Sequence, residues 1–225
     1  MDPEVLTKAP LFAGLDDENA MALSSAMGSL RLSKGEVLFH EGDTEDRLYV
    51  VVAGKIKLGR SGSAGRENLL AILGPGQMFG ELSLFDPGPR SSTATAVTAC
   101  EIRTLEHDEL MTWLTGHPEV AHGLLGQLAA RLRRANDVVA DLVFSDVPGR
   151  VAKQLLELAR RFGDKRDDGV HVHHDLTQEE LAQLVGASRE TVNKALADFA
   201  ARGWIRLEPR SVTLLDVERV ERRAR

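Results

Sequence analysis

The feature that most constrains this 225-residue chain is a heptad pattern between Pro118 and Ser145. Pro118 suits a first helical turn because its missing N–H would have no intrahelical partner there in any case. Apolar residues then recur at spacings of four and three, which predicts a helix of about seven turns with a narrow apolar seam. The seam consists of Ala121, Leu125, Leu128, Leu132, Ala135, Val139 and Leu142.

The period of the seam indicates whether this helix packs within its own subunit or against a second copy. A helix that covers the core of its own domain normally shows a wider apolar stripe with a 3.6-residue period, whereas the seam keeps a 3.5-residue period. We therefore expect the helix to pair with its copy in a homodimer. A core helix inside one subunit is the alternative.

Charge is unevenly divided between the two sides of this helix. Residues 1–145 contain 13 Lys and Arg against 20 Asp and Glu, whereas residues 146–225 contain 15 against 14. The net charge of −6 therefore belongs to the first part, and the second part can still bind DNA through a local basic face. The length and the 43% hydrophobic content fit two modest domains.

Cysteine usage and hydropathy exclude several classes of protein. Cys100 is the single cysteine, so the chain has no internal disulfide framework and cannot by itself hold an iron–sulfur cluster or a cysteine-rich zinc site. There is no signal peptide and no apolar run long enough to span a membrane. We expect a soluble, cytoplasmic protein without a membrane partner.

The first half changes from helical to strand-like texture at Lys34. Residues 6–12 and 16–27 predict a short helical lead-in, with Asp16 or Asp17 as N-cap. Apolar segments of strand length then alternate with glycine-containing turns, which predicts an antiparallel sandwich or barrel. The expected strands are residues 37–39, 48–52, 55–58, 68–73, 93–97 and 101–105.

The segment from Phe79 to Ser92 gathers groups that bind a sugar phosphate. Gly80 allows the backbone to approach a ligand closely, and residues 81–85 can form one helical turn whose N–H groups favour an anion. Arg90 adds a fixed cation with a fork of donors, and Ser91 adds a hydroxyl. These groups predict a phosphate site.

Glu81 needs a separate explanation because its carboxylate would repel a phosphate. It can accept a hydrogen bond from a sugar hydroxyl, as acidic residues do in ribose recognition. Phosphate and ribose together indicate a nucleotide. The alternative is that Glu81 caps a helix and Arg90 is a solvated surface charge.

After the long helix, Asp146 and Pro148 predict the start of another helix, and we interpret residues 146–150 as a hinge. Residues 163–169 predict a polar, exposed loop. Three histidines follow, but no further clustered ligands accompany them, so we interpret them as exposed imidazoles at a strand edge rather than a metal site. They are His171, His173 and His174.

Residues 175–194 have the length and the end signals of a helix-turn-helix. Thr177 and Glu180 form a capping box, Gly186 supplies the turn, and Ser188 caps the second helix. The expected inward-facing residues are Leu181, Ala182, Val185, Val192, Leu196 and Phe199.

The start of the second helix carries side chains that can read base edges in a major groove. Arg189 can donate to guanine O6 and N7, and Glu190 can accept from a cytosine amino group. A carboxylate hinders phosphate binding, so its presence favours base reading. The predicted DNA-binding residues are Ser188, Arg189, Glu190, Asn193 and Lys194.

Residues 203–215 predict a two-stranded wing, from which Arg206 and Arg210 could reach phosphates. The basic C-terminal residues are either a DNA contact or, with equal weight, a solvated tail. They are Arg219, Arg222, Arg223 and Arg225.

Residues 34–43, 48–49, 54–58 and 80–91 closely resemble the cyclic-nucleotide-binding fold. Together with the heptad helix and the helix-turn-helix, nearly the whole chain resembles the cyclic AMP receptor protein branch of the cyclic AMP receptor protein / fumarate and nitrate reductase regulator family. The resemblance implies an α+β protein with three parts. These are a jelly-roll-like cyclic-nucleotide-binding β-roll (1–117), a dimerisation helix (118–145) and a winged helix-turn-helix DNA-binding domain (146–225).

The resemblance also implies roles for single residues. Arg90 and Ser91 would bind the cyclic phosphate, and Glu81 the ribose. Ala135 and Asn136 occupy the positions of hydroxyl residues that contact adenine in the family, but Ala135 cannot donate or accept a hydrogen bond. Only Asn136 could read a base edge, so the choice between cAMP and cGMP stays open. The predicted ligand-binding residues are Gly80, Glu81, Leu82, Ser83, Arg90, Ser91, Arg131 and Asn136.

We therefore predict a homodimeric transcription regulator that binds cAMP and a palindromic operator, for which the resemblance implies GTGA-like half-sites. In the family, a loop near residues 163–169 can contact RNA polymerase. An enzyme is one alternative, but the sequence shows no metal cluster, no nucleophile beside a base and no Walker loop. A second alternative is a DNA-binding regulator of the same fold that depends little on cAMP or responds to another ligand.

Overall fold

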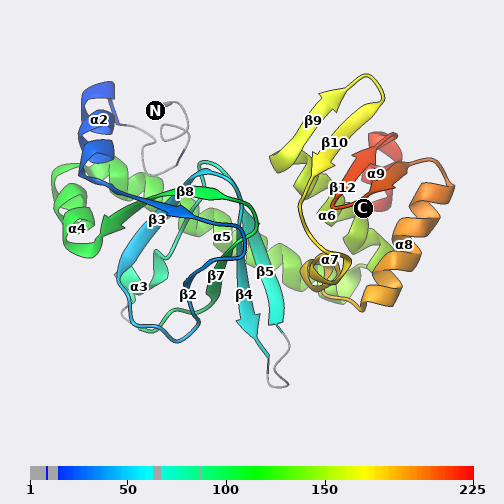
Figure 1. The fold of residues 1–225 in the computed structure, drawn as a ribbon, viewed down its shortest axis with the longest axis horizontal. Helices are drawn as coiled ribbons and strands as arrows, with labels where there is room; N and C mark the ends of the chain where they lie inside the picture. Colours follow the sequence, from blue (N-terminus) through cyan, green and yellow to red (C-terminus); the bar gives the residue numbers. More distant parts are fainter. Residues whose placement is uncertain (1–8, 10–14, 63–66, 87) are drawn as a thin grey trace. The chain divides into compact units, whose positions relative to one another are not determined.

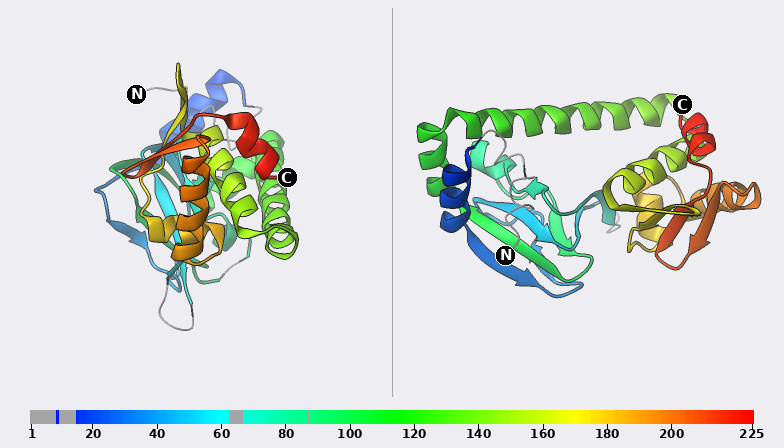
Figure 2. Two further views of the ribbon diagram at one scale, coloured as in Figure 1. Left: turned by 90° about the vertical axis from the view of Figure 1, so that its right-hand side faces the viewer. Right: turned by 90° about the horizontal axis from the view of Figure 1, so that it is seen from above.

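The computed structural model describes residues 9, 15–62, 67–86 and 88–225. Contacts divide the chain into two units, Met1–Arg134 and Ala135–Arg225 (Figure 1). The division falls within α5 (Pro118–Phe144), the helix that the heptad pattern predicts. Figure 2 shows α5 as one uninterrupted helix, so it contributes residues to both units. Of residues 6–12, over which a helical turn was expected, the structure describes Ala9 alone.

The first unit contains two four-stranded antiparallel sheets. The first has the order β1-β8-β3-β6, and the second has the order β2-β7-β4-β5. All six strands expected from the sequence are present. The first sheet comprises β1 (Gly28–Leu32), β3 (Arg47–Ala53), β6 (Met78–Phe79) and β8 (Cys100–Glu106), and the second comprises β2 (Val37–Phe39), β4 (Ile56–Ser61), β5 (Glu67–Leu73) and β7 (Thr93–Ala96).

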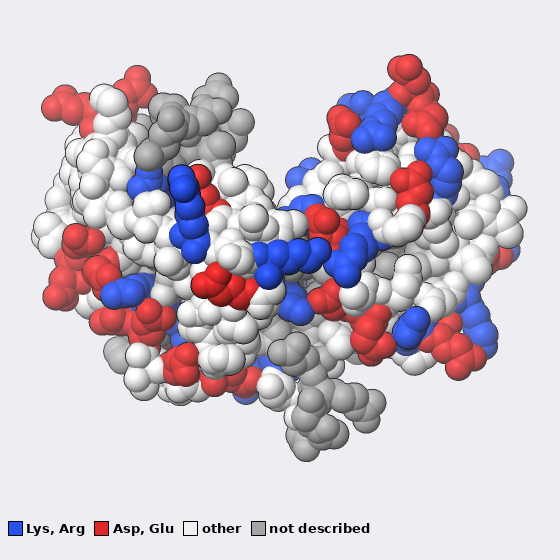
Figure 3. Space-filling view, in the orientation of Figure 1, with Lys and Arg blue, Asp and Glu red and all other residues white. Residues whose placement is uncertain are grey.

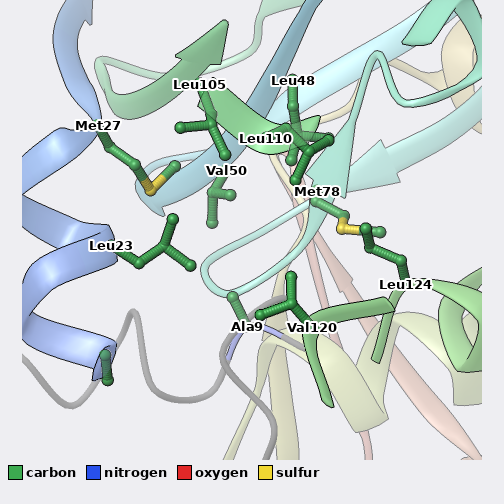
Figure 4. Packing of buried hydrophobic residues seen from close by; sticks show 11 residues of the cluster. Ala9, Leu23, Met27, Leu48, Val50, Met78, Leu105, Leu110, Val120 and Leu124 are labelled. Atoms are coloured by element: carbon green, nitrogen blue, oxygen red, sulfur yellow. The ribbon is translucent and has the colours of Figure 1, made fainter. Parts of the chain in front are cut away.

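Strand β3 is buried on both faces, which explains its continuous apolar sequence. Tyr49 and Val51 pack in a core with residues of both sheets. Leu48 and Val50 pack on the opposite side with three helices of the same unit (Figure 4). These helices are α2 (Asp17–Ala26), α4 (His107–Gly116) and the beginning of α5.

The second unit joins four helices to one antiparallel sheet of order β11-β12-β10-β9. Its strands are β9 (Gly163–Arg166), β10 (Gly169–His173), β11 (Ile205–Glu208) and β12 (Ser211–Leu214). Its helices after α5 are α6 (Val147–Phe162), α7 (Gln178–Val185), α8 (Arg189–Ala201) and α9 (Val217–Arg223). The predicted wing is therefore half of a four-stranded sheet.

The helix-turn-helix begins and turns as the sequence predicts. Thr177 Oγ1 accepts from the N–H of Glu180 at 3.1 Å, and the Glu180 carboxylate accepts from the N–H of Thr177 at 2.8 Å. Gly186 has φ +70°, which an alanine would adopt only with strain. Ser188 Oγ caps α8 by accepting from the N–H of Thr191 at 3.2 Å. All six residues expected to face inward are buried.

The prediction of a loop over residues 163–169 is wrong, because Gly163–Arg166 forms strand β9, which pairs with β10. All four residues of β9 are exposed, so its sequence shows no apolar alternation that would predict a strand. Main-chain pairing with β10 holds this edge strand in place. The C-terminal arginines up to Arg223 do not form a tail either. They lie on α9, which buries Val220 and packs on α6.

The histidine prediction is also partly wrong. Strand β10 is an inner strand, flanked by β12 and β9. His173 is exposed, but His174 is buried and its Nδ1 accepts from the N–H of Leu176 at 3.1 Å. His171 Nδ1 lies 3.0 Å from Thr213 Oγ1. No group of three or more His, Cys, Asp or Glu side chains that could hold a metal is found among the described residues.

The segment interpreted as a hinge lies inside the second unit. Arg150 donates to the carbonyl of Ser145 at 2.9 Å and to that of Val185 at 3.2 Å, and Lys153 pairs with Asp141. The start of α6 is thus bonded both to the end of α5 and to the turn of the helix-turn-helix. No helix in the described part of the chain is long and apolar enough to cross a bilayer.

Candidate functional site

A pocket in the first unit combines an apolar wall with buried charges. Its empty volume is about 400 Å³, part of which is open to solvent. Phe39, Leu58 and Phe79 come from the two sheets, and the remaining lining residues come from the segment after β6 and from α5. The lining residues are Phe39, Leu58, Phe79, Gly80, Glu81, Leu82, Pro89, Arg90, Ser91, Ser92 and Arg131.

Arg90 is only 4% exposed and is held by main-chain oxygens. Its Nη1 donates to the carbonyl of Gly80 and its Nη2 to the carbonyl of Arg47, each at 2.9 Å. The guanidinium carbon also lies 4.5 Å from the centre of the Phe39 ring. These contacts fix the cation before any ligand arrives, so Arg90 is not a solvated surface charge.

Gly80 permits this arrangement through its conformation and its lack of a side chain. Its φ is +83°, and an added Cβ would lie 2.7 Å from the Arg47 carbonyl oxygen and 2.8 Å from Arg90 Nη1. Any other residue would therefore strain the backbone and displace the guanidinium. The short helix α3 (Leu82–Phe85) follows, as the sequence predicts.

Glu81 is 1% exposed and forms an ion pair with Arg131 of α5. Arg131 also donates through Nη2 to the carbonyl of Met78 at 2.7 Å. The side chain of Glu81 makes no capping bond to α3, so the alternative role of helix cap is wrong. The ion pair connects the pocket directly to the long helix.

One oxygen of Glu81 distinguishes a binding site from a structural ion pair. Oε1 faces Arg131, whereas Oε2 is buried and accepts no hydrogen bond from the described residues. A buried carboxylate oxygen without a donor is costly, so this position calls for a hydroxyl or amine from a ligand. With Arg90 nearby for an anion, the residues of this pocket fit a ribose phosphate.

The recognition surface of the second unit has a different character. Glu190 and Lys194 of α8 pair at 2.7 Å, and their side chains are 76% and 74% exposed. Arg189 is exposed and Asn193 is half-buried. On the face drawn in Figure 3, basic and acidic side chains are interspersed in both units.

Arg206, which the sequence predicts to reach phosphates, already has carboxylate partners. It donates to Asp168 at 2.6 Å and to Glu208 at 3.2 Å. The hydrogen bond from Arg206 lowers the pKa of Asp168 below its ordinary value. Arg210 has φ +59° and donates to the carbonyl of Asp175 at 3.2 Å.

Comparison with known proteins agrees with the domain types predicted for both halves of the chain. Residues 29–117 match the family model of the cyclic nucleotide-binding domain, and residues 149–223 match that of the Crp-like helix-turn-helix domain. A CRP-like cAMP-activated global transcriptional regulator of Mycobacterium tuberculosis is 55% identical over 222 residues, 99% of each chain. The chain belongs to the CRP/FNR family.

Two solved structures support the fold of this CRP/FNR protein. The Thermus thermophilus catabolite activator protein is 37% identical over 96% of this chain and 98% of its own, with a TM-score of 0.57. FixK2 of Bradyrhizobium japonicum is 24% identical over 87% of this chain and 96% of its own, with a TM-score of 0.77. At this identity it supports the fold alone. The relatives are transcription regulators and not enzymes.

The structure of this family member brings most of the predicted ligand residues together. Gly80, Glu81, Leu82, Arg90, Ser91 and Arg131 line the pocket. Ser83 lies in α3, but its side chain is outside the described part. Asn136 is exposed on α5 and is not among the lining residues.

Sequence reasoning missed the rest of the lining. Phe39 and Leu58 were expected only as strand residues, and Phe79 only as the first residue of the predicted segment, because an apolar pocket wall and an apolar core have the same sequence pattern. The buried Ser92 follows the predicted Arg90 and Ser91, and that proximity was the one available signal. The carbonyl of Arg47 has no side-chain signature at all.

Proposed function

We propose that this chain is a cAMP-responsive transcription regulator that acts as a homodimer on a palindromic operator. The observation that carries the nucleotide assignment is the buried Glu81 Oε2, which lacks a donor, in the same pocket as the fixed Arg90. The name of the Mycobacterium tuberculosis relative, a cAMP-activated regulator, supports cAMP as the effector.

A cyclic nucleotide supplies one phosphate charge and a ribose hydroxyl. Arg90 and Ser91 would hold the phosphate, and Glu81 Oε2 would accept from the ribose hydroxyl. Because Glu81 also pairs with Arg131, a ligand that occupies its second oxygen would be connected to α5 through this carboxylate. Asn136 is then the residue of α5 available to read the base, in its own or the partner subunit.

The exposed seam of α5 supports the homodimer. Leu125 and Leu132 are each 64% exposed, and Val139 is 62% exposed. Large apolar side chains at a/d spacing on one long helix are stabilised when a second copy covers them. Residues 118–145 would therefore be the dimerisation helix.

The recognition helix α8 supports operator binding. Arg189 and Glu190 would read bases of GTGA-like half-sites, with Ser188, Asn193 and Lys194 beside them. In a symmetric dimer the two α8 helices must enter successive major grooves, roughly 34–36 Å apart. The exposed residues 163–168 would be the corresponding place for a contact with RNA polymerase.

The test is calorimetric titration with cAMP and cGMP, followed by operator binding with and without each nucleotide. If the nucleotide acts through α5, operator DNA should raise nucleotide affinity by the same factor by which the nucleotide raises operator affinity. Both factors must be measured at one salt concentration, because salt alone changes DNA affinity by orders of magnitude.

Two outcomes would contradict the proposal. Absence of nucleotide binding would refute the effector site. If nucleotide and operator change each other's affinity by factors near one, nucleotide binding in the pocket does not control DNA binding. The latter result would favour the second candidate, a regulator of the same fold that depends little on cAMP. Ala135, which cannot hydrogen-bond to a base, is the observation that keeps this candidate open.

A further inference from the structure

Glu45, just before β3, places a carboxylate against the cation of the pocket. Its Oε2 lies 3.5 Å from Arg90 Nη2, and its Oε1 lies 3.6 Å from Arg47 Nη1. Tyr49 also makes a side-chain hydrogen bond to this carboxylate. Glu45 does not line the pocket, and its side chain is 28% exposed. It therefore acts on the pocket through Arg90.

Arg90 does not depend on Glu45 for its position. Two carbonyl oxygens at 2.9 Å already hold its terminal nitrogens, and the Phe39 ring covers the guanidinium. By comparison, the contact with Glu45 at 3.5 Å is at the limit of a hydrogen bond. What Glu45 adds is a negative charge rather than orientation.

That charge completes an electrical balance around the pocket. Among the described residues, the positive charges of Arg90, Arg131 and Arg47 are matched by the negative charges of Glu45, Glu81 and Glu106. A cyclic phosphate adds one negative charge to this neutral set. The side chain of Arg90 is only 3% exposed, so solvent screens its interactions with nearby charges weakly.

We propose that Glu45 is an internal counter-ion that weakens the attraction between Arg90 and the phosphate of a cyclic nucleotide. Glu45 thereby sets the affinity of the pocket below the value that its lining residues alone would give. This inference rests on the proposed function, because it assumes that Arg90 binds the phosphate.

The variant Glu45→Gln tests the proposal because it keeps the shape of the side chain and an oxygen that can accept from Tyr49 and Arg90. Calorimetry should show about three- to tenfold tighter binding of cAMP, and cGMP should gain by the same factor since its phosphate is identical. Adenosine, which has no phosphate, should bind both proteins equally. The gain should shrink at high salt because Glu45 is partly exposed.

Asp46→Asn is the matched control. It removes the same charge from the adjacent, exposed residue, and nucleotide affinity should stay within twofold. Glu45→Ala should also tighten binding, which provides a second variant if the glutamine variant fails to fold. Thermal unfolding of each variant monitors the fold.

Three results would overturn the inference. Unchanged or weaker binding by Glu45→Gln, while the wild type binds cAMP, would refute the counter-ion role and leave the proposed function intact. An equal gain in Asp46→Asn would reduce the effect to net charge. If neither the wild type nor Glu45→Gln binds a cyclic nucleotide, the proposed function fails and the inference with it.

Discussion

The pocket and the recognition helix use the same chemistry at opposite degrees of burial. Glu81 pairs with Arg131 in the pocket, and Glu190 pairs with Lys194 on α8. Glu81 is 1% exposed, whereas the Glu190 side chain is 76% exposed. A buried carboxylate must keep a partner, but an exposed pair contributes only about 0.3–0.5 kcal/mol and opens readily.

This difference separates a preformed site from an adaptable one. Arg90 is fixed by carbonyls before a ligand arrives, so little ordering remains to be done when a nucleotide binds. On α8, Lys194 must be free to leave Glu190 if that carboxylate is to accept from a base. Single substitutions in the pocket should therefore change nucleotide affinity strongly. Substitutions on α8 should mainly change DNA binding.

The largest effect is expected from Arg90→Ala, which removes the cation fixed in the pocket. Nucleotide affinity should fall by about a hundredfold or more, because a charge-assisted phosphate contact is lost from a buried site. Calorimetry with cAMP measures the loss, and the dimer should remain folded. Arg60→Ala, an exposed arginine of β4, is the control and should bind normally. Undiminished affinity in Arg90→Ala would refute the site.

The second effect concerns stability and compares the two ion pairs directly. Arg131→Ala leaves the buried Glu81 without its cation and should lower the free energy of unfolding by about 2–3 kcal/mol, somewhat less than for a fully buried pair because Arg131 is partly exposed. Lys194→Ala should change it by less than about 0.5 kcal/mol. Chemical denaturation measures both. Equal losses would mean that burial does not distinguish the two pairs.

Whether a contact could be predicted from the sequence depends on whether it is local or distant along the chain. Caps and turns were predictable because the bond is made by a local side chain, as with Thr177 and Ser188. The contacts of Arg90 were not, because Gly80 and Arg47 hold it through carbonyl oxygens, and Glu45 is 45 residues away. Residue type indicated which groups belong to the site but not how they are held.

The missed strands have a related cause. In β1 only Leu32 is buried, and β6 has only two residues, so neither shows an apolar alternation. Strand β9 has four exposed residues. All three are held by main-chain bonds to a neighbouring strand, which no single segment of the sequence encodes.

The third prediction addresses base reading on α8. Arg189→Ala should cost about 1–3 kcal/mol of discrimination against the wrong base pair, because it removes a bidentate contact, while nucleotide affinity stays unchanged. Competition binding between the operator and a mutated operator at constant salt measures the loss. Arg202→Ala, at the exposed C-terminal end of the same helix, should keep full discrimination. If the two variants behave alike, Arg189 contributes charge and not sequence reading.

The smallest effect is expected from Ala135→Thr, which adds a hydroxyl on α5 next to Asn136. One hydrogen bond nets about 0.5–1.5 kcal/mol, so the ratio of cAMP to cGMP affinity should rise by no more than about tenfold. The phosphate contact is common to both nucleotides, so Glu45→Gln should leave this ratio unchanged. The two variants therefore separate base recognition from phosphate recognition within one pocket.

A control is needed because threonine also costs about 0.7 kcal/mol of helix propensity and Ala135 belongs to the seam of the proposed dimer. Ala129→Thr makes the same exchange at another exposed position of α5 and should leave the ratio unaltered. Sedimentation of both variants reports whether the dimer persists. If Ala135→Thr keeps the dimer and the wild-type ratio, Ala135 does not face the base, and selection of the nucleotide must depend on Asn136 and the β-roll.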